Sequence, residues 1–340
     1  MSHITVIGMD ISKHVFHIVG LDATRRIAIK RHLKRPQVLA WFANQTACQV
    51  SMEACASSHY WGRELTKLGH TVKLLPAQHV KAFVQGNKND YNDALAIAEA
   101  TSRPNLYAVP LKTTQQQDLQ AIQRMRKRAV TSRTALCNQT RGLLGEYGII
   151  IPKGVSVLRK VMPTLLEEAE NGLSPLFRTL LSRRYDQLIQ LDTDLEFYTT
   201  QLTQQAAQNQ AIQQLQTIPG FGPIVASAYH IHVGNGSVFA NGRAVSASLG
   251  LVPRQHSTGG KQVLSGISKR GDQELRSLLV HGARSVVRMA SKREDRLSRW
   301  VCQLVEKRGI NKATVALANK LARIAWAVTT KQTDYIRQAV

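Results

Sequence analysis

The sequence predicts an α/β N-terminal domain, a long helical stalk and a mainly helical C-terminal domain. Short β-rich runs alternate with helical segments over the first hundred residues. From residue 113 the composition shifts to Gln, Leu and basic residues, with apolar side chains at three- and four-residue steps. Helical segments return after residue 211, now around a glycine-rich turn and a basic loop. We therefore divide the chain into 1–110, 111–207 and 208–340.

The N-terminal elements predict a mixed sheet. Three strands separated by short connections, expected at 4–10, 15–19 and 26–30, suit an antiparallel meander. Further strands reached through helices suit parallel pairing. In chain order these are a helix at 37–43, a strand at 48–53, a helix at 61–68, a strand at 71–75 and a helix at 89–103.

The middle region predicts two long helices, at 113–147 and 173–207, interrupted by the segment GIIIP at 148–152. A first helix of this length would span about 50 Å at 1.5 Å per residue. Such a pair is typical of a stalk, and we expect a coiled coil. In the C-terminal region we expect helices on both sides of a turn within 215–226, and two more at 272–291 and 311–329.

The charge of the chain indicates a polyanionic partner. Lys and Arg number 45 and Asp and Glu 22, so the net charge is +23 at pH 7. Nucleic acid is the commonest such partner, although a merely basic soluble protein is the alternative. We expect no membrane span, no signal peptide, and, from four dispersed cysteines, neither a zinc site nor disulfides. These features predict a cytoplasmic protein.

Four carboxylates form the candidate metal site. Asp10 and Glu53 end predicted strands, so neighbouring strands would bring them to one sheet edge. Asp90 and Asp93 lie three residues apart at the start of a helix and share a face. Oxygen ligands of this kind suit Mg²⁺, and two ions can clamp both oxygens of a phosphodiester displacement. The alternative is that the four acids form no common site. Asp10 would then simply end a strand, Glu53 would be a surface acid, and Asp90 would cap a helix with Asp93 in its first turn.

The segment IPGFGP at 218–223 has the pattern of a helix-hairpin-helix turn. Gly220 and Gly222 would let backbone amides approach a phosphate, beside the positive N-terminus of the next helix. Such a turn binds nucleic-acid backbone without reading bases. The same turn also serves as a simple packing element between two helices.

A basic, hydroxyl-bearing loop is the candidate nucleophile site. Gly259 and Gly260 follow Ser257 and Thr258, and a hydroxyl among cations can attack phosphorus because the cations stabilise the transition state. The alternative is that Ser257 only hydrogen-bonds to a phosphate. The candidate phosphate-binding cations are Arg254, Lys261, Lys269 and Arg270 in this region and Arg126 and Arg128 in the stalk.

The order of these motifs resembles the transposases of the bacterial insertion-sequence 110 family, and its 1111 subgroup most of all. The motifs run from Asp10 to about Ala290 and read VIGMDISK, VSMEA, NKNDYNDA, IPGFGPIVA, GLVPRQHSTGGK and GISKRG. Together they are far more specific than any one of them.

The resemblance implies an RNase H-like, resolvase-like first domain, a coiled-coil stalk and a C-terminal transposase domain. It places the family's DEDD acids on Asp10, Glu53, Asp90 and Asp93. It further implies a covalent serine nucleophile acting with the acids of a partner subunit, and an element-encoded bridge RNA that pairs with donor and target DNA. Related members carry the serine where Thr258 stands. We assign Ser257, whose primary-type hydroxyl is less hindered, and Thr258 is the alternative.

The sequence-based hypothesis is thus a nucleoid-associated, magnesium-dependent, RNA-guided DNA recombinase working as a homodimer or homotetramer on double-stranded DNA. Two other classes compete with it. A metal-dependent Holliday-junction endonuclease would use the acids and water without a serine. A non-catalytic nucleic-acid binder would use only the turn and the basic loop.

Overall fold

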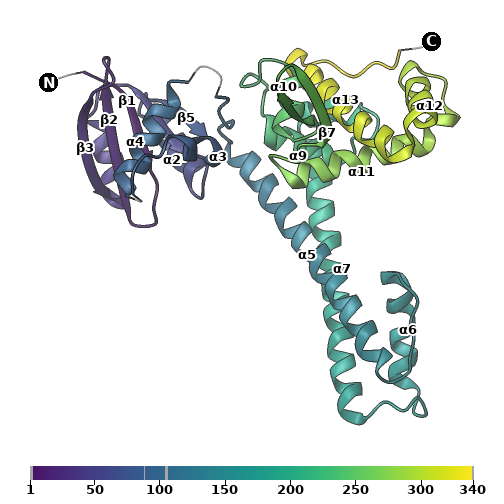
Figure 1. Cartoon of the computed structure of the whole chain (residues 1–340). Coiled ribbons are helices and arrows are strands. Elements are labelled where there is room, and N and C mark those ends of the chain that lie inside the picture. The colour runs from purple at the N-terminus through teal and green to yellow at the C-terminus, as the bar shows by residue number, and fades with distance from the viewer. Residues whose placement is uncertain (1–2, 88, 104–105, 339–340) are drawn as a thin grey trace.

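The computed structural model describes residues 3–87, 89–103 and 106–338. A sheet domain at the N-terminus and a helical domain at the C-terminus lie side by side, and a long helical stalk extends away from both (Figure 1). In the described ranges, no helix is both long enough and apolar enough to cross a membrane.

The N-terminal domain is built on a five-stranded sheet with the order β3-β2-β1-β4-β5. β1, β2 and β3 are antiparallel, whereas β4 runs parallel to β1 and β5 parallel to β4. This arrangement confirms the predicted meander with added parallel strands. The strands are β1 (Ile4–Asp10), β2 (Val15–Asp22), β3 (Ile27–Lys34), β4 (Gln49–Glu53) and β5 (Thr71–Leu75).

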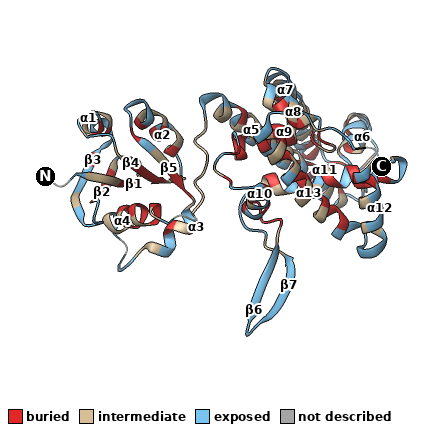
Figure 2. Ribbon diagram, turned by 90° about the horizontal axis from the view of Figure 1, so that it is seen from above, coloured by how far each residue is buried: buried red, intermediate tan, exposed pale blue. Residues whose placement is uncertain are grey.

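Helices cover both faces of this sheet (Figure 2). Trp61 and Leu65 of α2 pack with Phe16 and Met9 on one face. On the other face α4 packs Ala94 and its neighbours against β2. The helices are η1 (Arg35–Gln37), α1 (Val38–Ala43), α2 (Ser58–Lys67), α3 (Ala77–Val80), η2 (Lys81–Phe83) and α4 (Asp90–Thr101).

The stalk consists of α5 (Thr114–Gly145) and α7 (Pro175–Ala207), which pack along each other, and α6 (Val155–Glu167), which folds back at the far end (Figure 1). The two long predicted helices are therefore present. Between them Asp192 contacts Arg133 at 2.7 Å and Arg159 at 3.4 Å. Sequence patterning did not reveal α6, which has a proline inside it.

The C-terminal domain is mainly helical and packs around the buried Tyr229, whose hydroxyl donates to the carbonyl of Ala322 at 2.8 Å. The predicted helices near 272–291 and 311–329 are present. Its elements are α8 (Gln210–Gln216), α9 (Pro223–Val233), α10 (Gly242–Ser248), β6 (Pro253–Thr258), β7 (Lys261–Ile267), α11 (Gln273–Met289), η3 (Ala290–Lys292), α12 (Arg296–Arg308) and α13 (Ile310–Lys331).

The basic loop of the sequence prediction is in fact a β-hairpin, β6–β7. Gly259 and Gly260 have φ of +57° and +81°, so they form the two-residue turn that joins antiparallel strands most easily. Nearly the whole hairpin is exposed, and it projects from the domain (Figure 2). Neither strand buries a face, so the sequence lacked the alternation that predicts strands.

Candidate functional site

The four predicted carboxylates lie at one end of the N-terminal sheet. Asp10 is the last residue of β1 and Glu53 the last of β4, and the parallel register that pairs Met9 with Met52 makes the two acids neighbours. Asp90 and Asp93 occupy the first turn of α4. Asn89 caps this helix, accepting a hydrogen bond from the amide of Tyr91 at 2.9 Å.

A glycine in β1 lets α4 approach the sheet closely. A Cβ on Gly8 would lie 2.6 Å from the amide nitrogen of Ala98 and 2.9 Å from its Cβ. No side chain larger than hydrogen fits there unless the helix moves. Gly8, two residues before Asp10, therefore sets how closely the acidic first turn of α4 meets the acidic strand end.

The four carboxylates form one electrostatic group. The pKa of Asp10 is raised from 3.8 to about 6, mainly by burial and then by the charges of Asp93, Asp90 and Glu53, while His17 opposes the shift. Burial and Asp93 also raise the pKa of Glu53. Like charges held together in this way favour the binding of a proton or a cation.

The donor chemistry of this group fits a hard divalent cation, because carboxylate oxygens are the ligands that Mg²⁺ prefers. Over the part of the chain that the structure describes, no three His, Cys, Asp or Glu side chains stand close enough together to hold one ion. Asp90 is instead turned toward His17, with its Oδ2 3.4 Å from Nδ1 of the histidine. The acids are gathered but not in coordination geometry.

Sequence reasoning missed His17 as a member of this site. It lies on β2 directly opposite Asp10 and packs edge to face on Tyr91, with ring centroids 4.8 Å apart. Next to it, Nδ1 of His32 lies 3.3 Å from the Tyr91 hydroxyl. The short turn between β1 and β2 was the available signal, since it fixes which residues face each other across the hairpin.

The glycine-rich turn between α8 and α9 packs closely on α11 and lies beside a cavity. Gly220 has φ of +83°, and a Cβ there would lie 2.7 Å from the carbonyl oxygen of Gly282, so this residue is needed for close packing on α11. Gly222, at the start of α9, has open space around it. A cavity of about 420 Å³ beside the turn is also lined by Arg293 and Arg337.

The hairpin β6–β7 carries Ser257 and Thr258 just before its turn, and both residues are exposed. The side-chain amide (Nε2) of Gln255 donates to Oγ of Ser257 at 2.7 Å. The predicted cations Arg254 and Lys261 are exposed on the same hairpin, and Lys269 and Arg270 follow it.

The root of the hairpin is fixed tightly to the helical domain. The amide of Ser268 donates to the carbonyl of Val252 at 2.8 Å. One guanidinium nitrogen of Arg276 donates at 2.9 Å to the carbonyls of both Leu249 and Arg270. A Cβ on Gly250 would meet the backbone of residues 269–270, so glycine is required. The free tip is therefore carried on a rigid base.

The hairpin and the carboxylates do not meet within one chain. β6 and β7 extend from the C-terminal domain, whereas the acids belong to the sheet domain beside it (Figures 1 and 2). In the stalk, the Nε of Arg126 donates to Thr199 at 2.9 Å and joins two helices, whereas Arg128 is exposed.

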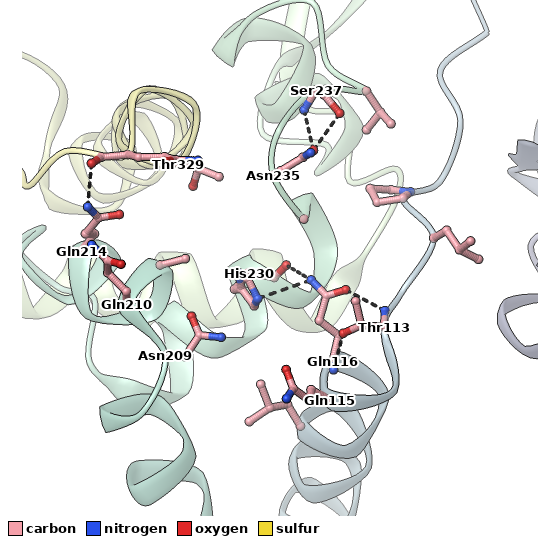
Figure 3. A pocket seen from close by; sticks show the side chains of 17 residues that line it. Thr113, Gln115, Gln116, Asn209, Gln210, Gln214, His230, Asn235, Ser237 and Thr329 are labelled. Atoms are coloured by element: carbon pink, nitrogen blue, oxygen red, sulfur yellow. Dashed lines mark hydrogen bonds between the residues drawn. The ribbon is translucent and has the colours of Figure 1, made fainter. Parts of the chain in front are cut away.

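A separate cavity of about 670 Å³ lies where the linker meets the stalk and the C-terminal domain (Figure 3). Amide side chains dominate its lining, and none of its lining residues is an acid or a cysteine. Gln116 donates to the carbonyl of His230 at 3.5 Å and accepts from the amide of Thr113 at 3.0 Å. These contacts fix the start of the stalk against the C-terminal domain.

Fold and site together define the class of protein. A mixed sheet with clustered carboxylates is consistent with a DEDD nuclease-like fold. It is joined to a helical domain that carries an exposed β-hairpin with hydroxyl side chains near its turn. The molecule is a nucleic-acid-processing enzyme of the DEDD type.

Comparison with known proteins makes this specific. Residues 7–149 match the DEDD transposase model of the IS110 group, and residues 212–298 match the model described as transposase IS116/IS110/IS902 family. The chain belongs to the IS110 family of transposases, so it carries out transposition by DNA cleavage and rejoining. DEDD-type transposases typically depend on divalent metal ions.

Relatives resemble the chain over nearly its full length. A probable family 20 transposase of Pseudomonas aeruginosa is 45% identical over 97% of this chain and 98% of its own. The transposase for insertion sequence element IS1111A of Coxiella burnetii is 43% identical over 98% of this chain and 92% of its own. The transposase for insertion sequence element IS1328 of Yersinia enterocolitica is 41% identical over 98% of this chain and 99% of its own. The predicted family is therefore confirmed.

Proposed function

We propose that this transposase cuts and rejoins DNA through a covalent phosphoserine intermediate, with Mg²⁺ held by Asp10, Glu53, Asp90 and Asp93. The observation that carries the proposal is the gathering of the four acids at one end of the sheet, where burial and then the neighbouring carboxylates raise the pKa of Asp10. When bound, the metal would supply Lewis-acid stabilisation of charge on the phosphate. Ligation would require Asp90 to turn away from His17, which lies 3.4 Å away.

In the proposed step, Oγ of Ser257 attacks the scissile phosphorus and forms a new P–O bond. The bond from phosphorus to the leaving sugar oxygen breaks, and that oxygen takes up a proton, while the serine proton passes to solvent or a carboxylate. Arg254 and Lys261 on the same hairpin would offset the charge that builds at phosphorus. Because the phosphoserine retains the bond energy, reversal of the step on another strand rejoins the DNA without a further energy source.

The separation of hairpin and acids within one chain supports a site shared between subunits. We propose a homodimer or homotetramer in which the hairpin of one subunit reaches the acids of another. The rigid hairpin root and exposed tip suit such a reach.

Subunit mixing tests the shared site. Asp10→Asn and Ser257→Ala are each expected to abolish cleavage when purified alone. Mixing and re-annealing the two variants should restore part of the activity, because a mixed oligomer holds one intact pair of acids and serine. Failure of the mixture, with each variant still folded and oligomeric, would contradict a shared site. Cleavage by Ser257→Ala and Thr258→Ala at full rate would instead support a water-using endonuclease.

We further propose that a bridge RNA encoded by the element pairs with donor and target DNA and supplies the sequence specificity. The exposed Arg128 of the stalk and the cations near the hairpin are candidate contacts to RNA and DNA backbones. Sequencing the RNA that co-purifies with the protein tests this. A single species from the non-coding part of the element is expected, and random cellular RNA would contradict RNA guidance.

A further inference from the structure

A basic strand forms the edge of the N-terminal sheet. β3 is the outermost strand in the order β3-β2-β1-β4-β5, and it lies at the outer side of the domain (Figure 1). Within and beside it, these cations and one histidine are exposed: Arg25, Arg26, Lys30, Arg31, His32, Lys34 and Arg35. Neither Lys30 nor Lys34 lies within ion-pair distance of an acid in the described ranges.

The strand register sorts these side chains between the two faces of the sheet. Arg31 pairs with Ile18, which faces the core under α1 and α2. Lys30 pairs with Val19, which packs against α4 on the opposite face. Because side chains alternate along a strand, Lys30, His32 and Lys34 share the α4 face, and Arg31 points to the other.

The α4 face is the one that carries the carboxylates. Gly8 faces α4, so Asp10, two residues on, faces the same way. Asp10 pairs with His17 and His17 pairs with His32, so one lateral row crosses the sheet from the acids to the basic edge. The contact between His32 and the hydroxyl of Tyr91 on α4 confirms the side on which this row lies.

We propose that Lys30, His32 and Lys34 form a backbone-binding track for the DNA strand whose phosphate is presented to the four acids. Alternate residues of a strand are about 6.6–6.8 Å apart, close to the separation of successive phosphates in an extended nucleic-acid strand. His32 of the track lies in the same lateral row as Asp10, two strands away. The positive charge of the track offsets the repulsion between the acids and the incoming phosphates. The inference rests on the proposed role of the acids in cutting.

A different reason exists for lysines on an edge strand, which is that they block pairing with another sheet. That purpose is served by charges on either face of the strand. The track requires the acid-bearing face alone, so Arg31 provides a matched control on the same strand with the opposite orientation.

Lysine footprinting separates the two explanations. Full-length protein carrying Arg31→Lys is treated with an amine-acetylating reagent, without divalent metal, in the presence and absence of a mixed-sequence oligonucleotide, single-stranded in one arm and duplex in the other. DNA should slow acetylation at Lys30 and Lys34 and leave the lysine introduced by Arg31→Lys unchanged. Equal protection at the three positions, or protection at none, would overturn the track.

Binding and cleavage provide a second readout. Lys30→Gln and Lys34→Gln should each reduce the slope of log K against log salt by about 0.7–0.9, the loss of one phosphate contact, whereas Arg31→Gln should not. With Mg²⁺, the lysine variants should raise KM for DNA and keep kcat. Footprinting needs no cleavage, so it tests the track independently of the acids. Absence of protection at Lys30 and Lys34 would refute the track even if Asp10→Asn abolishes cleavage. Full cleavage by Asp10→Asn would refute the role of the acids even if the two lysines are protected.

Discussion

Replacing Asp10 by Asn should stabilise the metal-free N-terminal domain. The pKa of Asp10 is raised from 3.8 to about 6 by burial and by the neighbouring acids, so the folded domain binds this proton more tightly than the unfolded chain does. Stability therefore falls as the pH rises from about 4 to about 6, and the loss persists at higher pH. Asn carries no charge and removes the loss.

The size of the effect follows from the shift. A change from 3.8 to about 6 corresponds to about 3 kcal/mol at 1.36 kcal/mol per unit. Asp10 is only half-buried, and solvent screening reduces this figure to roughly 1–2 kcal/mol. The gain of Asp10→Asn over the native protein should thus be near zero at pH 4 and reach this value above pH 7.

Urea-dependent hydrogen exchange of peptides covering β1 and β4 measures the free energy of this domain by itself. Adding Mg²⁺ at pH 7.5 should stabilise the native protein and have much less effect on the variant, because a cation relieves the same repulsion. A variant that is less stable than the native protein above pH 7, or a gain that does not change with pH, would refute the raised pKa of Asp10.

Three further predictions follow from other contacts. Gly8→Ala should push α4 away from the sheet at Ala98 and lower the free energy of unfolding by about 1–3 kcal/mol. It should also reduce the rate of DNA cleavage, and an unchanged rate would contradict the role of the close approach. Gly260→Ala strains the positive-φ turn and should reduce DNA cleavage without changing the melting of the helical domain. Burial lowers the pKa of His59 to about 4, helped by Lys112, so stability should fall as pH drops from 6.5 toward 4; His59→Gln should flatten this fall in an unfolding titration.

The sequence predicted the elements whose burial pattern is regular. The β1–β2–β3 meander and the long stalk helices bury regular apolar positions, so periodicity revealed them. The hairpin β6–β7 was missed as a structural element because it buries almost nothing, and α6 because its helix includes Pro163. The convergence of Asp10 and Glu53 was predictable from strand order alone.

Other parts of the site depend on packing that sequence patterns do not encode. His17 reaches Asp90 only because α4 crosses β1 and β2, and the close approach at Gly8 depends on the position of a helix about ninety residues later in the chain. Gly220 matched the pattern of a phosphate-binding turn, but its contact with Gly282 shows a packing requirement at the same residue.

Identifying the residue in the covalent adduct tests the central proposal most directly. The full-length protein is reacted with a nicked DNA substrate that traps the intermediate, and the phosphorylated residue is located by mass spectrometry. Ser265→Ala on the same hairpin, where Oγ donates to the carbonyl of Arg254 at 3.4 Å, is the matched control and should retain the adduct. We predict an adduct on Ser257 that Ser257→Ala and Asp10→Asn both abolish. An adduct on Thr258, or cleavage with no adduct at all, would contradict it.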